Sequence, residues 1–153
     1  MSREIQTKTD AFSGVTMTCA ALAAGAARQS SFLTNTNQRP AFLFFLRLQS
    51  GAVAPTAGTI YELFLLRANT SNQRTDNAGS SDAAITINNA QLIGTLQVTA
   101  NTNTNFADVF DSAPLGKLGV NFAVAVRNST NQALNGTETN HVKQYSLYLP
   151  DIQ

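Results

Sequence analysis

Few residues of this 153-residue chain are of the kinds that do chemistry, and they are not spaced as in known catalytic motifs. The single histidine, His141, cannot build a multi-histidine metal site, and its place at the start of a predicted strand favours an exposed or interface residue over a catalytic base. Asp108 and Asp111 flank a short apolar stretch, where a glycosidase-like carboxylate pair is conceivable. A solvated Asp108 and a turn-capping Asp111 are the simpler interpretation. With no Gly-x-Ser-x-Gly elbow and no phosphate-binding glycine loop, the sequence predicts no catalytic residues and no enzyme.

The run from Asp76 to Asp82 gathers oxygen-bearing side chains, as calcium-binding loops do. Its spacing does not match an EF-hand, and no bidentate glutamate follows at the right distance. We therefore predict no metal site and no cofactor, and calcium binding by this loop is the less favoured alternative.

Glu62 stands out because it interrupts an apolar strand. A lone buried carboxylate is costly, so it needs a partner or a route to water. Arg47, near the end of the preceding apolar segment, could reach it diagonally across a hairpin. We expect a structural Arg47–Glu62 ion pair, with a subunit contact as one possible setting, and we expect mutation of either residue to damage assembly or stability.

The elements that would position these side chains include two almost wholly apolar segments, at residues 41–48 and 59–67. Successive residues of a strand point to opposite faces, so a strand with one wet face should alternate apolar and polar side chains. Both faces of these segments are apolar instead; Phe42 and Phe44 load one face of the first segment, while Leu43 and Phe45 load the other. We predict that the two segments pair as a hairpin. The core would cover one of its faces, and a second layer or another subunit would cover the other.

The rest of the chain favours strands and turns. Only 12% of its residues are charged, and it contains 18 threonines and 15 asparagines, which suit strands and turns and are weak helix formers. About eight short strands and no long helix are predicted, with Leu92, Leu96 and Val98 pointing inward in one of them. This pattern indicates an all-β fold, an antiparallel β-sandwich that is jelly-roll-like. We expect an N-terminal arm at residues 1–14 and a single sandwich domain at 15–153.

The charge pattern and the cysteine count bound the partners and the compartment. The net charge is +1 and the ten basic residues are spread along the chain, so we expect no nucleic-acid partner. No apolar run is long enough for a membrane span and the N-terminus has no hydrophobic leader, so we expect no membrane partner and synthesis in the cytoplasm. The single cysteine, Cys19, is expected to be a buried free thiol.

Several motifs give the chain a family resemblance. They are structural rather than catalytic, and they lie at residues 25–30, 55–58, 61–67, 74–79, 92–98, 118–124 and 128–134. In these motifs the chain resembles small virion structural proteins of tailed bacteriophages, in particular head-decoration or cement proteins. The resemblance implies a location in the virion, synthesis in a host cytoplasm, binding to the major capsid protein, and a homo-oligomer, with a trimer favoured.

We expect the interface residues to lie in the charged arm and on the two apolar segments; they are Arg3, Glu4, Lys8, Phe45, Arg47, Glu62 and Phe64. The arm would become ordered as it docks on a neighbour. The alternative function is a carbohydrate-binding jelly-roll module of a tail, neck or fibre. The lack of tryptophan, and the placing of Tyr145 and Tyr148 on opposite faces of the last strand, weaken that alternative.

Overall fold

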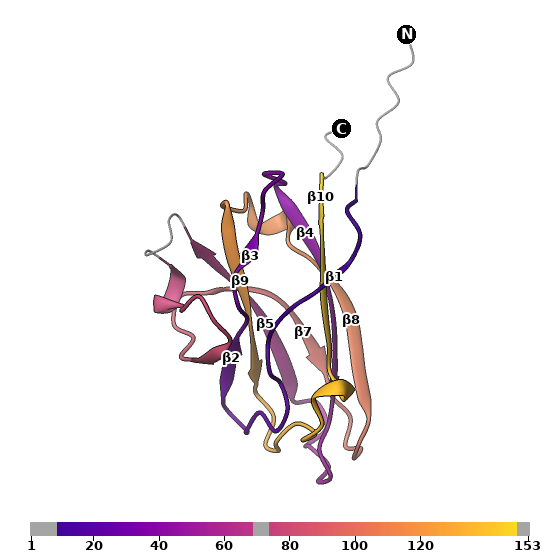
Figure 1. Cartoon of the computed structure of the whole chain (residues 1–153). Helices are drawn as coiled ribbons and strands as arrows, with labels where there is room; N and C mark the ends of the chain where they lie inside the picture. The colour runs from indigo at the N-terminus through magenta and orange to yellow at the C-terminus, as the bar shows by residue number, and fades with distance from the viewer. Residues whose placement is uncertain (1–8, 69–73, 150–153) are drawn as a thin grey trace.

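The computed structural model describes residues 9–68 and 74–149, and this part of the chain folds as two antiparallel sheets packed face to face (Figure 1). One sheet, called the β4 sheet below, has the strand order β1 (Ser13–Gly14), β10 (Val142–Tyr148), β4 (Ala41–Gln49), β8 (Asn105–Asp111). The other, called the β5 sheet, has the order β6 (Ala83–Ile85), β2 (Ala27–Gln29), β9 (Asn121–Asn128), β5 (Ile60–Ala68), β7 (Gln91–Gln97), and β3 (Leu33–Thr34) also pairs with β9. The remaining elements of the described residues are three short 3-10 turns, at Thr75–Asn77, Ala113–Leu115 and Glu138–Asn140. The prediction of an all-β antiparallel sandwich is confirmed.

The strand order is that of a jelly roll. With the short strands β3 and β6 set aside, the first strand pairs with the last, the second with the next to last, and so on inward: β1 with β10, β2 with β9, β4 with β8, and β5 with β7. This nesting is what results when a long antiparallel ribbon wraps around a core, which is the jelly-roll arrangement.

The predicted hairpin of the two apolar segments is wrong. These segments are β4 and β5, and they lie in different sheets, where each is hydrogen-bonded to other strands. They face each other across the core instead. The segment that joins them therefore crosses from one sheet to the other. Two strands that are apolar on both faces can be hydrogen-bonded neighbours in one sheet or can face each other across the core, and their apolar content does not distinguish these arrangements.

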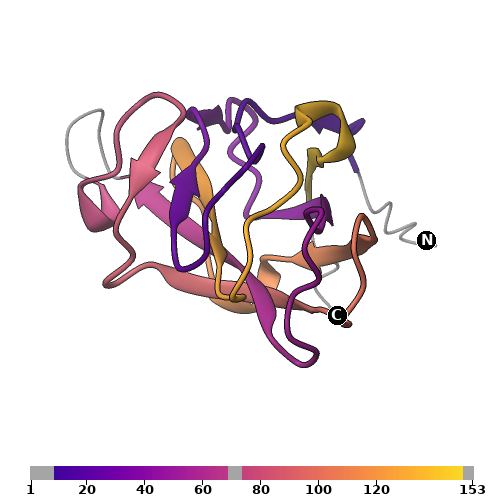
Figure 2. The same cartoon turned by 90° about the horizontal axis from the view of Figure 1, so that it is seen from below.

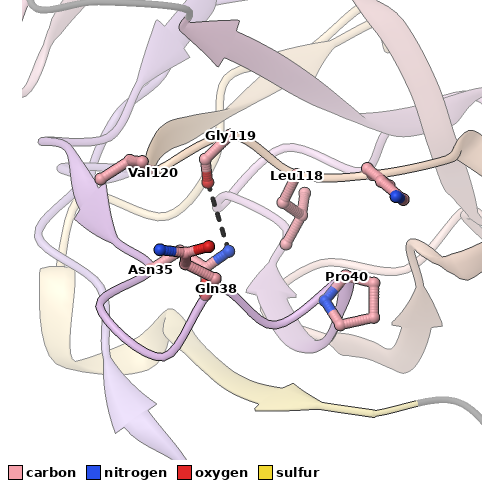
Figure 3. Close-up of a pocket in the computed structure, with 7 residues that line it drawn as sticks. Asn35, Gln38, Pro40, Leu118, Gly119 and Val120 are labelled. Atoms are coloured by element: carbon pink, nitrogen blue, oxygen red, sulfur yellow. Dashed lines mark hydrogen bonds between the residues drawn. The ribbon is translucent and has the colours of Figure 1, made fainter.

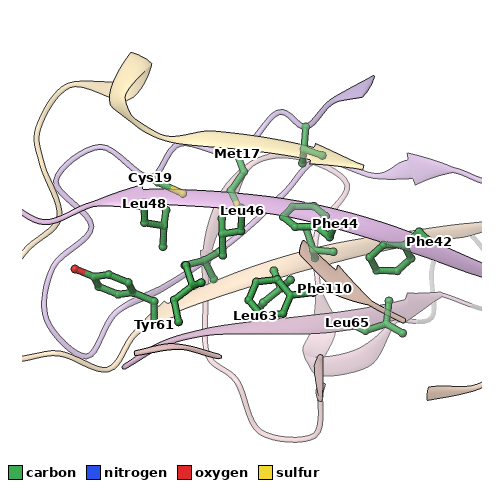
Figure 4. Close-up of a cluster of buried hydrophobic side chains, with 14 of the residues drawn as sticks. Met17, Cys19, Phe42, Phe44, Leu46, Leu48, Tyr61, Leu63, Leu65 and Phe110 are labelled. Atoms are coloured by element: carbon green, nitrogen blue, oxygen red, sulfur yellow. The ribbon is translucent and has the colours of Figure 1, made fainter. Parts of the chain in front are cut away.

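The core lies between β4 and β5, and it buries the apolar side chains on the inner face of each strand (Figure 4). Phe42, Phe44 and Leu46 are fully buried, and Tyr61 and Leu63 meet them from the opposite sheet. The Phe42 ring stacks on the ring of Phe122 from β9 at 4.9 Å between centroids, which ties the two sheets together.

A second, smaller apolar cluster covers the outer face of the β5 sheet. Its buried members are Phe64, Leu66, Ala78, Ala123 and Ala125. The cover comes from the described residues between β5 and β7, with Phe32 from the connection between β2 and β3 packed beside them. Figure 2 shows the described part of the segment between β5 and β7 beside β2, away from β4, β10 and β8. The chain thus supplies its own second layer here. Asp76 holds this layer together by accepting hydrogen bonds from the backbone N–H groups of residues 88–90.

The described end of the predicted arm lies along the chain's own sheet. Thr9 forms a bridge with Tyr148, and β1 pairs with residues 144 and 145 of β10. After β1, Val15, Met17 and Cys19 are buried while the residues between them are exposed, as expected where apolar and polar side chains alternate along an extended segment. Cys19 is a buried free thiol, as expected, and burial raises its pKa to about 12.

One predicted inward residue, Leu92, is exposed. A bulge in the β5–β7 pairing pairs Leu63 with Gly94 but Phe64 with Leu92, so the side-chain alternation of β7 changes face at that point. In the described residues, no helix is long and apolar enough to cross a membrane.

Candidate functional site

The outer face of the β4 sheet is the candidate interaction surface. Along β4 the side chains of Leu43, Phe45 and Arg47 alternate with the core residues and are half-buried. The register places Phe45 between Gln144 of β10 and Val109 of β8. Nothing in the described chain forms a second apolar layer here like the one over β5.

The centre of this surface is apolar. Phe12, Phe45, Val109 and Gln144, called the outer patch below, line a shallow hollow of about 260 Å³. Phe12 is 44% exposed and Val109 is 50% exposed, although both are large hydrophobic side chains. A single exposed apolar residue is ordinary on protein surfaces, but two that border one hollow with the half-buried Phe45 indicate a contact site.

Opposite charges flank the outer patch along the strands. Arg47 lies on one side of Phe45, opposite Ala107 and Val142, and Leu43 lies on the other side, opposite Asp111. Among the described residues Arg47 has no carboxylate partner, and its Nε atom is buried without a hydrogen bond. A half-buried guanidinium without a partner is poised to bind an acidic group.

Asp111, on the other side of the outer patch, has one of its two carboxylate oxygens hydrogen-bonded within the chain. Its Oδ1 atom accepts a hydrogen bond from the backbone N–H of Ala113 at 2.8 Å and another from the Tyr148 hydroxyl. Burial, followed by this carboxylate, raises the pKa of Tyr148, so the hydroxyl stays protonated and donates. The Asp111 Oδ2 atom accepts no hydrogen bond from the described residues, and the side chain is exposed.

The expected Arg47–Glu62 ion pair does not form, because the two residues lie in different sheets. Glu62 pairs with Arg127 of the adjacent strand β9 instead, in a bidentate contact at 2.6 and 2.8 Å, and the Ser129 hydroxyl donates a further bond. The Arg127 hydrogen bond is the largest cause of the lowered pKa of Glu62. The prediction of a structural ion pair at Glu62 was therefore right about the carboxylate and wrong about its partner.

The sequence did contain a signal for Arg127. It is the one charged residue of the otherwise mostly apolar strand Asn121–Asn128, but the sequence did not reveal that this strand is the neighbour of the strand of Glu62. Arg127 also lies over the ring of Phe64, at 5.1 Å from its centroid. Because Phe64 is buried by residues of its own chain, we do not include it, or Glu62, in the interaction surface.

His141 is neither exposed nor at a surface, contrary to expectation. It is only 4% exposed, its Nδ1 atom accepts the backbone N–H of Gln49, and its Nε2 atom donates to the Asn135 carbonyl. Burial is the largest cause of its lowered pKa. The imidazole thus joins the end of β4 to the loop before β10, a structural role.

The carboxylates considered for glycosidase chemistry and for calcium binding have structural or solvent-exposed positions. Asp108 is exposed and Asp111 caps a turn, as the simpler interpretation held. In the loop considered for calcium, Asp76 binds backbone N–H groups, and Asp82 binds Thr18 and the guanidinium of Arg28. No group of three or more metal-ligating side chains occurs in the described part of the chain.

A pocket of about 480 Å³, called the loop-end pocket below, opens between the β3–β4 loop and the loop that precedes β9 (Figure 3). Its lining includes Asn35, Gln38, Pro40, Leu118 and Gly119, without an aromatic ring. The Asn35 amide is buried and donates to the carbonyls of residues 39 and 119, so it shapes the pocket rather than offering a free group. Lys117 supplies the one charged group of the lining.

The last-strand tyrosines do lie on opposite faces. Tyr145 packs edge-on against Phe122 in the core, and Tyr148 is 9% exposed on the other face. Neither presents a free ring for stacking on a sugar. The arm residues Arg3, Glu4 and Lys8 lie outside the described residues.

Comparison with known proteins identifies no family for this chain. No protein-family model matches the sequence, and no curated protein matches it significantly. The class that the structure defines is therefore an antiparallel β-sandwich with jelly-roll strand order.

Proposed function

We propose that this protein is a non-enzymatic structural part of a bacteriophage virion, a capsid decoration or cement protein that binds the major capsid lattice and stabilises the head. It is synthesised in the host cytoplasm and acts as a homo-oligomer in the virion, with neither nucleic acid nor membrane as a partner. The resemblance of its motifs to small phage virion proteins supports this role, and for the oligomer it implies a trimer.

One observation carries the proposal: the described residues leave the apolar outer face of the β4 sheet half open, whereas they cover the outer face of the β5 sheet. A domain that already has a sound core and a self-made second layer gains little stability from keeping Phe12 and Val109 in water. Such a face favours a part that is completed by its neighbours. A cement protein acts by adding contacts that resist expansion of a packed head.

Particles that lack the protein test this role. We expect them to release their DNA at a lower temperature, and under a milder osmotic shock, than complete particles. Adding back the purified full chain should restore resistance, and averaged electron-microscopy density should place it on the outside of the head. Density in the neck or tail, with heads of unchanged resistance, would contradict the proposal.

The second candidate is a carbohydrate-binding module of a tail, neck or fibre, which the loop-end pocket favours. Its lining combines the Lys117 ammonium with the side-chain amide of Gln38, which are groups that bind acidic sugars and sugar hydroxyls. Glycan-array binding that is lost in Lys117→Ala and kept in Val109→Ser would support this function over capsid decoration.

A further inference from the structure

We propose that the outer face of the β4 sheet binds the same face of a second copy of this chain, about a two-fold axis that crosses the strands at Phe45 and Val109. Each copy then places Arg47 over the row of the other copy that contains Leu43 and Asp111. The inference goes beyond the virion role and does not depend on it, because it concerns the purified protein.

The outer face is arranged symmetrically about its central row. That row runs across the sheet from Gln144 through Phe45 to Val109. Arg47 and Leu43 each lie two residues from Phe45 along β4, so each is about 7 Å from the central row at ~3.4 Å per residue. A two-fold axis along this row therefore lays Val109 on Val109 and brings the row of Arg47 over the row of Leu43 and Asp111.

The rotation also brings opposite charges together. Within one chain the rows of Arg47 and Asp111 are four residues apart, about 14 Å, and their side chains do not meet. After the rotation, each Arg47 lies over Leu43 of the other copy, and Asp111 of that copy is one strand away, at about 4.8 Å. The Oδ2 atom of Asp111 accepts no bond from the described residues, and the same contact occurs twice in the dimer. The partly desolvated Nε atom of Arg47 then gains the acceptor that it lacks in the single chain.

The distribution of apolar side chains favours a second copy as the occupant. A self-complementary patch closes a dimer, whereas a head-to-tail ring needs a second, different patch on the same molecule. The other large hydrophobic residues exposed in the described chain, Val53, Leu92, Val120 and Leu149, are on separate elements. The geometry therefore predicts a dimer in place of the trimer that the resemblance implies.

Sedimentation of the full chain and two matched variants tests this interface. We expect the wild type to form dimers. Val109→Asp should weaken self-association by at least about tenfold because it places two carboxylates on the axis. The control, Val120→Asp, alters a side chain of similar exposure (58% against 50%) in a loop and should leave the dimer intact. A monomeric wild type, a trimer, or equal behaviour of the two variants would overturn the proposal.

Charge reversal tests the pairing itself. Arg47→Asp and Asp111→Arg should each weaken the dimer, since like charges then face each other, and the double variant should restore it. A merely structural role for either residue predicts no such rescue. Failure of the double variant to dimerise, although it is folded by circular dichroism, would contradict the pairing.

Cross-linking tests the same interface without relying on Asp111→Arg, which could fail to fold. The native thiol of Cys19 is buried, so in Val109→Cys a thiol-reactive linker spanning ~10 Å, the usual spacing of packed sheets, should join two chains, while Val120→Cys should not be joined. No cross-link at position 109 overturns the dimer. Loss of capsid binding in Val109→Asp from a wild type that is monomeric in solution would assign the face to the capsid protein instead.

Discussion

The outer faces of the two sheets differ in how far the described chain covers them. The outer face of the β5 sheet carries Phe64 and Leu66, and the chain covers it with the segment between β5 and β7. The outer face of the β4 sheet carries Leu43 and Phe45, equally apolar in sequence, and the described chain leaves it half open. Apolar content on both faces of a strand therefore predicts a need for cover on both. It does not report whether the cover is intramolecular.

The polar residues follow the same division. On the covered face, the Glu62 carboxylate is bound by Arg127 and Ser129. On the open face, Arg47 and Asp111 are held apart by the central row of the outer patch. The charged groups of the covered face are thus paired within the chain, and those of the open face are the ones that the proposed dimer would bring together.

The largest expected effect is on the covered face. Leu66→Ala should lower the free energy of unfolding by about 2–5 kcal/mol, because it opens a cavity at a side chain that is 1% exposed. Leu43→Ala, the matched change on the open face, should cost less than about 1 kcal/mol in the monomer. Urea unfolding at low protein concentration measures both. Equal losses would remove the distinction between the two faces.

Next in size is the loss of the ion pair. Arg127→Ala should destabilise the protein by about 2 kcal/mol because it leaves the 8%-exposed Glu62 carboxylate without its main partner. The half-exposed position of Arg127 keeps this below the cost of breaking a fully buried pair. Arg47→Ala is the control and should change monomer stability little. Thermal unfolding compares the two, and a larger effect from Arg47→Ala would restore the pairing expected from the sequence.

A smaller effect should appear with pH at the end of the β4 sheet. The folded state holds His141 neutral with a lowered pKa, whereas the unfolded chain takes up a proton near pH 6.5. Stability is therefore present at neutral pH and is lost as the pH falls below about 6.5 toward the folded-state pKa. Glu138 opposes this shift, while Lys143 and Arg47 add to it. Unfolding midpoints at pH 7.5 and 5.5 should differ in the wild type, and the part of that difference due to His141 should vanish in His141→Gln.

The smallest effect is expected on the open face below the dimerisation concentration. Val109→Ser removes apolar surface that is half in water, so the unfolding free energy of the monomer should change by less than about 0.5 kcal/mol. At high concentration the wild type should be more resistant to unfolding than this variant, because association stabilises the folded state by mass action. Concentration-independent midpoints for both chains would argue against an interface here.

Much of the fold could be predicted from the sequence, and the failures share a cause. The alternation at Val15, Met17 and Cys19 gave the correct buried face because side-chain direction in an extended chain is a local property. The pairing of Glu62 with Arg127, 65 residues apart, depends on which strands become neighbours, and alternation carries no information about that. Leu92 was misplaced for a related reason, since one bulge moves a side chain to the other face.

The sequence by itself determined an all-β sandwich, a buried free thiol, and two strands that need cover on both faces. These follow from side-chain type and from the two-residue period of a strand. Only the tertiary structure decided that β4 and β5 face each other across the core, and that His141 is enclosed. It also decided that one outer face is covered by the chain itself while the described residues leave the other half open. These outcomes depend on contacts between distant segments, which form when the ribbon wraps into the jelly roll and brings together residues that no local pattern relates.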